Sequence, residues 1–117
     1  MSGGLSIHCV DVAHGKVATG LAVSLRKLNA SQLLLEGVID TSGLLSHPLL
    51  MSEAISAGGY EVRFAVGDFY RQLGVKLPSP AFLEMVPYQF HLADTLSHYH
   101  LPFKFTPWGF SLFRGGA

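Results

Sequence analysis

The 117-residue sequence has little charge, a single cysteine and no long apolar run. Charged residues make up only 14% of the chain, and the formal net charge is zero. Such a chain has no electrostatic reason to bind nucleic acid or an acidic membrane surface. The longest apolar runs, such as the one at 32–35, are far too short to cross a bilayer. Cys9 alone cannot form an internal disulfide, which fits a reducing compartment. We therefore expect a cytoplasmic protein with neither a nucleic-acid partner nor a membrane.

The chain also lacks a signal-like start, a repeat and a low-complexity tract. The segment 1–4 is short and polar, without the apolar region of a signal peptide, so export is not expected. The length allows one domain with a real core, and we predict a single domain over 1–117. Because 49% of the residues are hydrophobic while few are charged, part of the apolar surface is expected to be buried between subunits.

What dominates the sequence is a series of short segments in which apolar and polar residues alternate, separated by turn-forming residues. A period of two is typical of half-buried strands. Strands are predicted at 5–11, 21–27, 32–39, 44–46, 60–66 and 84–93, and in a C-terminal ribbon with arms at 98–105 and 110–116. The pattern predicts an all-β sandwich of seven to eight strands with one short helix.

Three local signals refine this prediction. Asp68 is expected to cap the short helix over 69–73, and Gly74 to end it. Pro87 cannot donate to a strand ladder, so its strand is expected at an edge of a sheet or at a bulge. The segment 48–57 lacks strand alternation and is predicted as a loop with a helical turn.

The C-terminal ribbon carries polar side chains on a face that the core does not need. Alternation places His98, His100 and Lys104 on one face of the first arm and aromatic and aliphatic side chains on the other. In the first predicted strand, His8 lies on the face opposite Cys9. From the pattern alone, solvation and a functional site explain the polar face of the ribbon about equally well.

Five segments together resemble the transthyretin-related 5-hydroxyisourate hydrolases, and the match spans nearly the whole chain. Leu-Ser-Ile-His-Cys-Val-Asp at 5–11 is similar to the family's opening Leu-Ser-x-His-Val-Leu-Asp. Tyr-Glu-Val-Arg-Phe at 60–64 resembles its Tyr-Glu-Leu-x-Phe strand. Asp-Thr-Ser-Gly-Leu at 40–44 occupies the place of its Thr-x-x-Asp-Gly-Arg turn. His-Tyr-His-Leu-Pro at 98–102 resembles His-Tyr-His-Val-Pro, and Phe-Arg-Gly-Gly at 113–116 falls at the terminal Tyr-Arg-Gly-Ser.

The resemblance implies a transthyretin-like sandwich and a homotetramer built as a dimer of dimers, with active sites in clefts between the dimers. It implies hydrolytic ring opening of a small molecule, 5-hydroxyisourate, in urate breakdown, without a metal or another cofactor. His8 and His100 stand at the family's catalytic histidines. Histidine suits acid–base chemistry at neutral pH, so one ring is expected to activate water. The other orients the water or stabilises the developing charge, and the sequence does not decide between the two assignments.

The sequence departs from the family at two places in this site. Leu44 replaces the family's arginine, and leucine cannot clamp an oxyanion as a guanidinium does, a loss of ~2.7–4 kcal/mol in comparable sites. Phe113 and Gly116 replace the terminal tyrosine and serine, which suggests a less polar pocket. Lys104 is expected either to supply a cation to this pocket or to reach solvent at its mouth. The predicted substrate-binding residues are Leu44, His98, Lys104, Ser111, Phe113, Arg114, Gly115 and Gly116.

Three other interpretations are open. A diverged enzyme would use the same histidine pair for cyclisation, isomerisation or elimination on a more apolar small molecule. A carrier of a small hydrophobic ligand, like transthyretin, is less favoured because a carrier has no need of the two histidines. A zinc site made by His8, His98 and His100 is disfavoured, because the histidine pair of the family works without metal.

Overall fold

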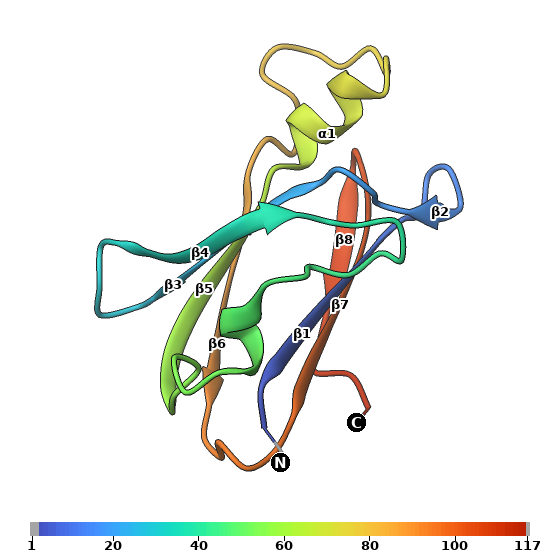
Figure 1. The fold of residues 1–117 in the computed structure, drawn as a ribbon. Coiled ribbons are helices and arrows are strands. Elements are labelled where there is room, and N and C mark those ends of the chain that lie inside the picture. Colours follow the sequence, from blue (N-terminus) through green and yellow to red (C-terminus); the bar gives the residue numbers. More distant parts are fainter. Residues whose placement is uncertain (1–2, 117) are drawn as a thin grey trace.

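A computed structural model describes residues 3–116, which form two four-stranded sheets packed into a sandwich (Figure 1). Met1, Ser2 and Ala117, which belong to the predicted domain 1–117, lie outside the described residues. Within the described range there are eight strands and one α-helix, so the predicted fold class is confirmed. No helix in this range is long and apolar enough to span a membrane.

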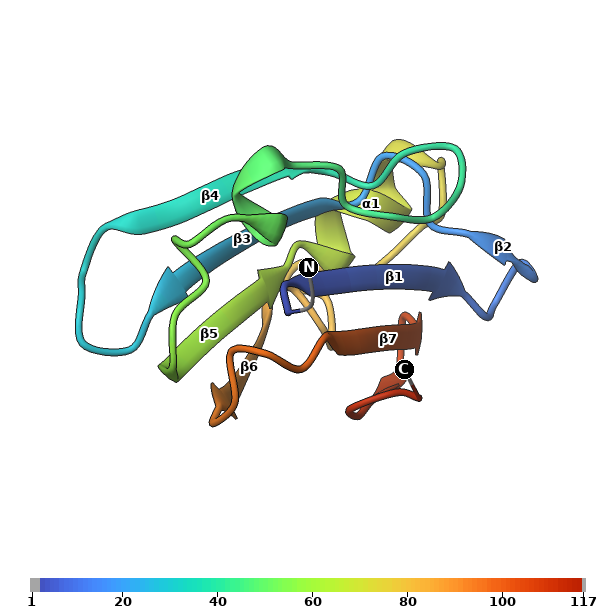
Figure 2. The same ribbon diagram turned by 60° about the horizontal axis from the view of Figure 1, so that its bottom comes forward.

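The two sheets have the strand orders β2-β1-β7-β8 and β4-β3-β5-β6 (Figure 2). β1 and β7 are parallel neighbours, whereas the other paired strands are antiparallel. The elements are β1 (Leu5–Asp11), β2 (Lys16–Val17), β3 (Ala22–Lys27), β4 (Leu33–Val38), the 3₁₀ helix η1 (Pro48–Met51), β5 (Gly58–Phe64), α1 (Val66–Gln72), β6 (Val86–Leu92), β7 (Tyr99–Thr106) and β8 (Gly109–Leu112).

The helix begins three residues earlier than the sequence predicted. Asp68 lies inside its first turn, and the N-terminal cap is Ala65, whose side chain makes no capping hydrogen bond. The predicted Asp68 cap is therefore wrong. The N–H of Gly67 instead donates to the carbonyl of Glu84 at 3.0 Å, so a neighbouring loop satisfies a free donor of the first turn. Gly74 follows the helix with φ +83°, as its predicted role as a stop requires.

Two strand predictions also change. Residues 44–46 form only isolated bridges, at Leu44 and Leu45, and β2 lies in a segment that the sequence predicted as a loop. Two-residue strands and single bridges carry too little alternation to be recognised from a sequence. The edge position predicted from Pro87 is confirmed, because β6 is the last strand of its sheet.

Aromatic side chains between the two sheets make the centre of the core. Phe64 and Phe103, from opposite sheets, stack with ring centroids 3.8 Å apart. Tyr70 of α1 packs edge-to-face against Phe105 of β7. The hydroxyl of Tyr70 also donates to the buried carboxylate of Asp11 at 2.6 Å, which ties the helix to the end of β1. This core fixes β1 and β7 side by side and leaves their outer face available.

Candidate active site

The parallel pairing of β1 and β7 brings the two predicted catalytic histidines onto one face. Ser6 pairs with His100 and His8 pairs with Pro102 in the register of the two strands. Because residues paired in neighbouring strands point to the same side, these side chains share the outer face of the sheet. The ring centroids of His8 and His100 are 6.5 Å apart, and both rings are half-buried. A small molecule on this face can therefore contact both imidazoles.

A chain of hydrogen bonds lies beside His100. The Oγ of Ser6 is 2.6 Å from Nδ1 of His100 and 2.9 Å from Nε2 of His98. The Nδ1 of His98 donates to the carbonyl of Gly3 at 2.9 Å. Ser6 was not among the predicted site residues. The available signal was its position on the same strand face as His8, two residues away.

His98 is thus placed behind His100, with both of its ring nitrogens in hydrogen bonds. These contacts do not leave a free nitrogen on His98 for a metal ion. Among residues 3–116, no group of three or more His, Cys, Asp and Glu side chains has the arrangement of a metal site.

Leu44 lies directly beside His8, where the sequence predicted the main departure from the family. The two residues form an antiparallel bridge, flanked by a hydrogen bond of 2.9 Å from the Cys9 N–H to the Gly43 carbonyl. The side chain of Leu44 is 37% exposed. Leucine therefore presents an apolar surface next to an imidazole, on the face where the family would place a guanidinium.

The loop that carries Leu44 is held by one carboxylate. Asp40 accepts hydrogen bonds from the side chains of Ser42 and Ser46 and from the backbone N–H groups of Ser42 and Leu44. These bonds, the Ser42 hydroxyl first among them, hold the pKa of Asp40 well below its usual range. The loop is therefore organised by the Asp40 carboxylate within its own turn and by backbone hydrogen bonds from Cys9 to Gly43 and from Leu45 to Ile7.

The C-terminal segment, residues 113–116, folds back over His100. The N–H of Gly115 donates to the His100 carbonyl at 2.7 Å. A Cβ on Gly115 would come within 3.0 Å of Cδ2 of the His100 ring and within 3.2 Å of Cδ of Pro102. A side chain at position 115 would therefore require the His100 ring or Pro102 to shift by a few tenths of an ångström. Gly116 and Phe113 are exposed, and a Cβ on Gly116 would meet no other atom within 4 Å.

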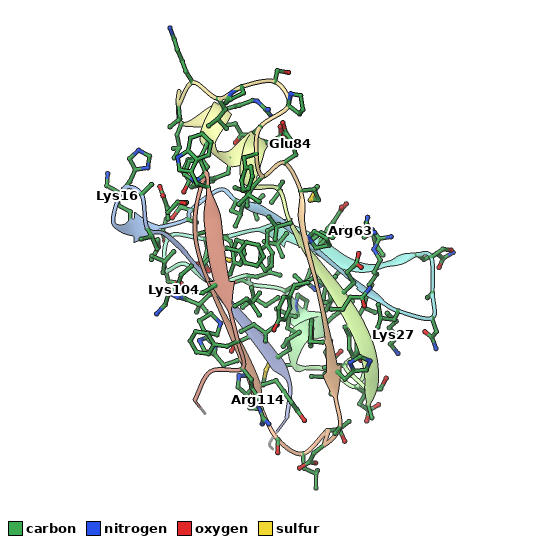
Figure 3. The ribbon with its side chains drawn as sticks, turned by 180° about the vertical axis from the view of Figure 1, so that it is seen from behind. Lys16, Lys27, Arg63, Glu84, Lys104 and Arg114 are labelled. Carbon is green, nitrogen blue, oxygen red and sulfur yellow. The ribbon has the colours of Figure 1, made fainter. Side chains whose placement is uncertain are left out.

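The two cationic side chains predicted for the site, Lys104 and Arg114, lie at different places along the sandwich (Figure 3). The guanidinium of Arg114 stacks 3.9 Å from the centroid of the Tyr99 ring, which is on the opposite face of β7 from His100. Lys104 is exposed and is paired with Val10 and, in β8, with Ser111. Lys104 and Ser111 share the outer face with the histidines, whereas the partner recorded for the Arg114 guanidinium is the Tyr99 ring. A role of these residues in substrate binding stays a prediction.

Burial and neighbouring charge favour the uncharged form of His100. The pKa of His100 lies below its ordinary value, first because burial disfavours the imidazolium and then because His8 and His98 repel it. Burial also raises the pKa of the Cys9 thiol strongly, and Cys9 faces the core, opposite to His8. A neutral His100 can take up a proton, as a general base must, and Cys9 is not placed as a nucleophile.

Comparisons with known proteins agree with this architecture. Residues 5–115 match the family described as HIUase/Transthyretin. The chain is 42% identical over 116 residues to "5-hydroxyisourate hydrolase 2" of Rhizobium meliloti (strain 1021), covering 97% of both chains. It is 44% identical over 115 residues to the 5-hydroxyisourate hydrolase of Ralstonia nicotianae, covering 97% of this chain and 98% of the relative.

Solved structures show the same fold. The crystal structure of (S)-allantoin synthase matches with a TM-score of 0.85 and 27% identity, over 97% of this chain and 44% of that chain. The 5-hydroxyisourate hydrolase of Klebsiella pneumoniae matches with a TM-score of 0.80 and 25% identity, over 97% of this chain and 94% of that chain. Sea bream transthyretin in complex with thyroxine has a TM-score of 0.83 at 21% identity, over 97% and 96%. The predicted transthyretin-like sandwich is confirmed.

Proposed function

Since the chain belongs to the HIUase/Transthyretin family, we propose that it is an enzyme that hydrolyses 5-hydroxyisourate, a small-molecule substrate of urate breakdown. One observation carries this proposal: His8 and His100 meet on one sheet face, in a chain similar over nearly its full length to 5-hydroxyisourate hydrolases. The roles of the individual residues below are part of the same proposal.

In the proposed reaction, Nε2 of neutral His100 takes a proton from a water molecule as the water oxygen attacks a ring carbonyl carbon. Negative charge develops on the carbonyl oxygen, and His8 donates a hydrogen bond to it. The tetrahedral intermediate then collapses with cleavage of the ring C–N bond, and the imidazolium of His100 returns the proton to the departing nitrogen. Water is consumed, the ring opens, and His100 ends the cycle uncharged.

His8 receives the second role because of its surroundings. It is adjacent to Leu44, which stands where the family has an arginine, so an imidazole is the polar group that remains beside this position. Removing a single oxyanion donor typically costs 10²–10³ in kcat. On this assignment, His8 supplies part of the stabilisation that the missing guanidinium would give.

We further propose a homotetramer, as a dimer of dimers, formed by one domain spanning 1–117. Support comes from the family and from the apolar side chains that remain exposed at the β7–β8 end and beside His8. Leu44, Trp108, Phe110 and Phe113 are 37%, 61%, 44% and 48% exposed, respectively. A second subunit would cover this apolar surface and close a cleft over the histidines. Mass measurement during size-exclusion chromatography tests the assembly, and a stable monomer contradicts it.

We also propose a cytoplasmic location. The single cysteine is buried, and a chain without disulfides does not need an oxidising compartment. Fractionation of cells that produce the protein from its own gene tests this location.

A second candidate is a diverged enzyme that applies the same histidine pair to a more apolar molecule. Leu44 favours it, because it presents apolar surface beside His8. Phe113 adds an exposed aromatic side chain to the C-terminal segment whose Gly115 approaches His100.

One assay tests the proposal against this alternative. Purified protein is mixed with freshly made 5-hydroxyisourate, and the ultraviolet decay is followed beside a Leu44→Arg variant. Fast decay with the unmodified protein supports the hydrolase. Decay that is accelerated only by Leu44→Arg favours the diverged enzyme, because the missing arginine then accounts for the lack of hydrolase activity.

A further inference from the structure

Four groups form a continuous hydrogen-bonded chain that ends on Nδ1 of His100. They are the Gly3 carbonyl, the His98 ring, the Ser6 hydroxyl and the His100 ring, joined by contacts of 2.9, 2.9 and 2.6 Å. We propose that Ser6 and His98 are positioning residues, which fix the tautomer of His100 so that its Nε2 is free to act as the base. The catalytic consequence of this positioning rests on the proposed function, whereas the tautomer of His100 does not depend on it.

The direction of the hydrogen bonds follows from the Gly3 carbonyl, the first of the four groups. The Gly3 carbonyl can only accept, so Nδ1 of His98 carries a hydrogen. In a neutral imidazole the other nitrogen is then an acceptor, and the Ser6 hydroxyl donates its only hydrogen to Nε2 of His98. The Ser6 oxygen must therefore accept from His100, which places a hydrogen on Nδ1 of His100. The remaining nitrogen of neutral His100, Nε2, has a free lone pair.

The reverse order requires a charge. If Ser6 donated to His100, Nε2 of His98 would have to donate to Ser6 while Nδ1 still donated to Gly3. His98 would then be an imidazolium, next to the half-buried His100 ring. With both rings uncharged, only one arrangement of hydrogens satisfies all three contacts.

The first member of the chain is held rigidly in place. Gly3 has φ +94°, and a Cβ there would lie 2.2 Å from the carbonyl oxygen of Thr95. The adjacent carbonyl of Gly4 accepts from the Tyr99 N–H at 3.0 Å, which joins this segment to the strand that carries His100. Glycine at position 3 is thus required by backbone conformation and by space, and its carbonyl is fixed relative to His98.

At the other end of this series of hydrogen bonds, Nε2 of His100 is free of protein donors. No hydrogen-bond partner of its Nε2 is found among residues 3–116. A histidine base must present an unprotonated nitrogen to the water that it activates, and the hydrogen bond on its other nitrogen selects which one that is. A ring without the Ser6 contact can exchange tautomers and rotate, so only part of the molecules would be competent.

The first test uses substitutions at Ser6. Ser6→Ala removes the hydroxyl, Ser6→Thr retains it, and Ser24→Ala is a matched control on β3, where a serine is also half-buried. With 5-hydroxyisourate as the substrate, Ser6→Ala should lower kcat by about 10–100-fold, part of the 10²–10⁴ that a general base contributes. KM should change little, Ser6→Thr should recover most of the rate, and Ser24→Ala should be unaffected. If the unmodified protein is active, equal kcat in Ser6→Ala and Ser24→Ala overturns the proposal.

The second test does not depend on the substrate. Long-range ¹H–¹⁵N correlation spectra of ¹⁵N-labelled protein at neutral pH report which ring nitrogen of each histidine is protonated. We expect hydrogen on Nδ1 for both His98 and His100 in the unmodified protein, and a shift of His100 toward the Nε2–H tautomer in Ser6→Ala. Hydrogen on Nε2 of His100 in the unmodified protein overturns the proposal even if no variant folds well.

The two tests separate the two proposals. Suppose that His100 has the Nδ1–H tautomer, that Ser6→Ala loses it, and that the protein is inactive on 5-hydroxyisourate. This result supports the positioning role of Ser6 and His98 and rejects the proposed function. If the protein hydrolyses 5-hydroxyisourate while His100 carries its hydrogen on Nε2, the proposed function is supported and the positioning role of Ser6 and His98 is rejected. His98→Gln provides a further check: it should disturb the His100 signals, while His91→Gln, at an exposed histidine on β6, should leave them unchanged.

Discussion

A Cβ atom on Gly43 would lie only 2.6 Å from Nε2 of the His8 imidazole. Gly43 has φ +87°, and its carbonyl accepts the N–H of Cys9, so the backbone lies close against β1 at this point. The bare Cα of Gly43 forms one wall of the space that His8 occupies. The position of His8 is therefore set by a turn residue as much as by its own strand.

Gly43→Ala should displace the His8 ring and reduce activity. Both variants of a matched pair, Gly43→Ala and Gly74→Ala, place alanine at a similar positive φ, which costs about 1–2 kcal/mol of stability. A Cβ on Gly74 meets nothing within 4 Å. We expect kcat/KM to fall about a hundredfold in Gly43→Ala, as for misplaced groups in other enzymes, and to remain unchanged in Gly74→Ala. Equal activities of the two variants would show that the contact with His8 is unimportant.

The lowered pKa of His100 sets the acid limb of activity. Because burial and the two neighbouring histidines favour the neutral ring, the pH at which half of kcat/KM is lost should lie below the ordinary histidine value of about 6.5. A pH–rate profile measures this. Half of the activity lost above pH 6.5 would contradict the assignment of His100 as the base.

The same shift makes a prediction for stability. The folded pKa of His100 is lower than the unfolded one, so the unfolded chain binds more protons between the two values. The contribution is fully present above pH 6.5 and is lost as the pH falls through the folded pKa. Urea unfolding at pH 7.5 and pH 5 should therefore show a smaller loss of stability in His100→Gln than in the unmodified protein. An identical loss in both proteins argues against the shift.

The contact between Tyr70 and Asp11 should be a major support of the helix. Asp11 is 2% exposed and accepts the Tyr70 hydroxyl at 2.6 Å, so Tyr70→Phe removes a donor from a buried carboxylate. We expect a cost of about 1.5–3 kcal/mol in the free energy of unfolding, measured in urea. Tyr88→Phe is the control, since its hydroxyl lies 3.5 Å from the Leu112 carbonyl and is only half-buried. Similar costs for the two variants would contradict the special role of Asp11.

Strand alternation predicted much of the site, because one rule of period two decides which face each residue takes. It placed His8 opposite Cys9 and His100 opposite Leu101, as the structure has them. It did not reveal Ser6 as a functional residue. The contacts of Ser6 depend on β1 lying beside β7 in one particular parallel register, and sequence periodicity contains no information about strand neighbours.

Where local signals competed with tertiary contacts, the tertiary contacts decided the structure. Asp68 has the chemistry of a helix cap, but the first turn of α1 uses the Glu84 carbonyl instead, and burial of Phe69 holds the helix. Arg114 follows the last strand, where alternation no longer applies, and the ring of Tyr99 offers its guanidinium a stacking partner. Both contacts join residues that are distant in sequence, so local sequence signals do not predict them.

The most direct test of the account is the ultraviolet decay of freshly made 5-hydroxyisourate with the unmodified protein, with His100→Gln and with His91→Gln. The account predicts that the unmodified protein and His91→Gln accelerate the decay equally, and that His100→Gln is slower by about 10²–10⁴-fold. Decay that is equally fast with His100→Gln, or that the unmodified protein does not accelerate over the spontaneous rate, contradicts it.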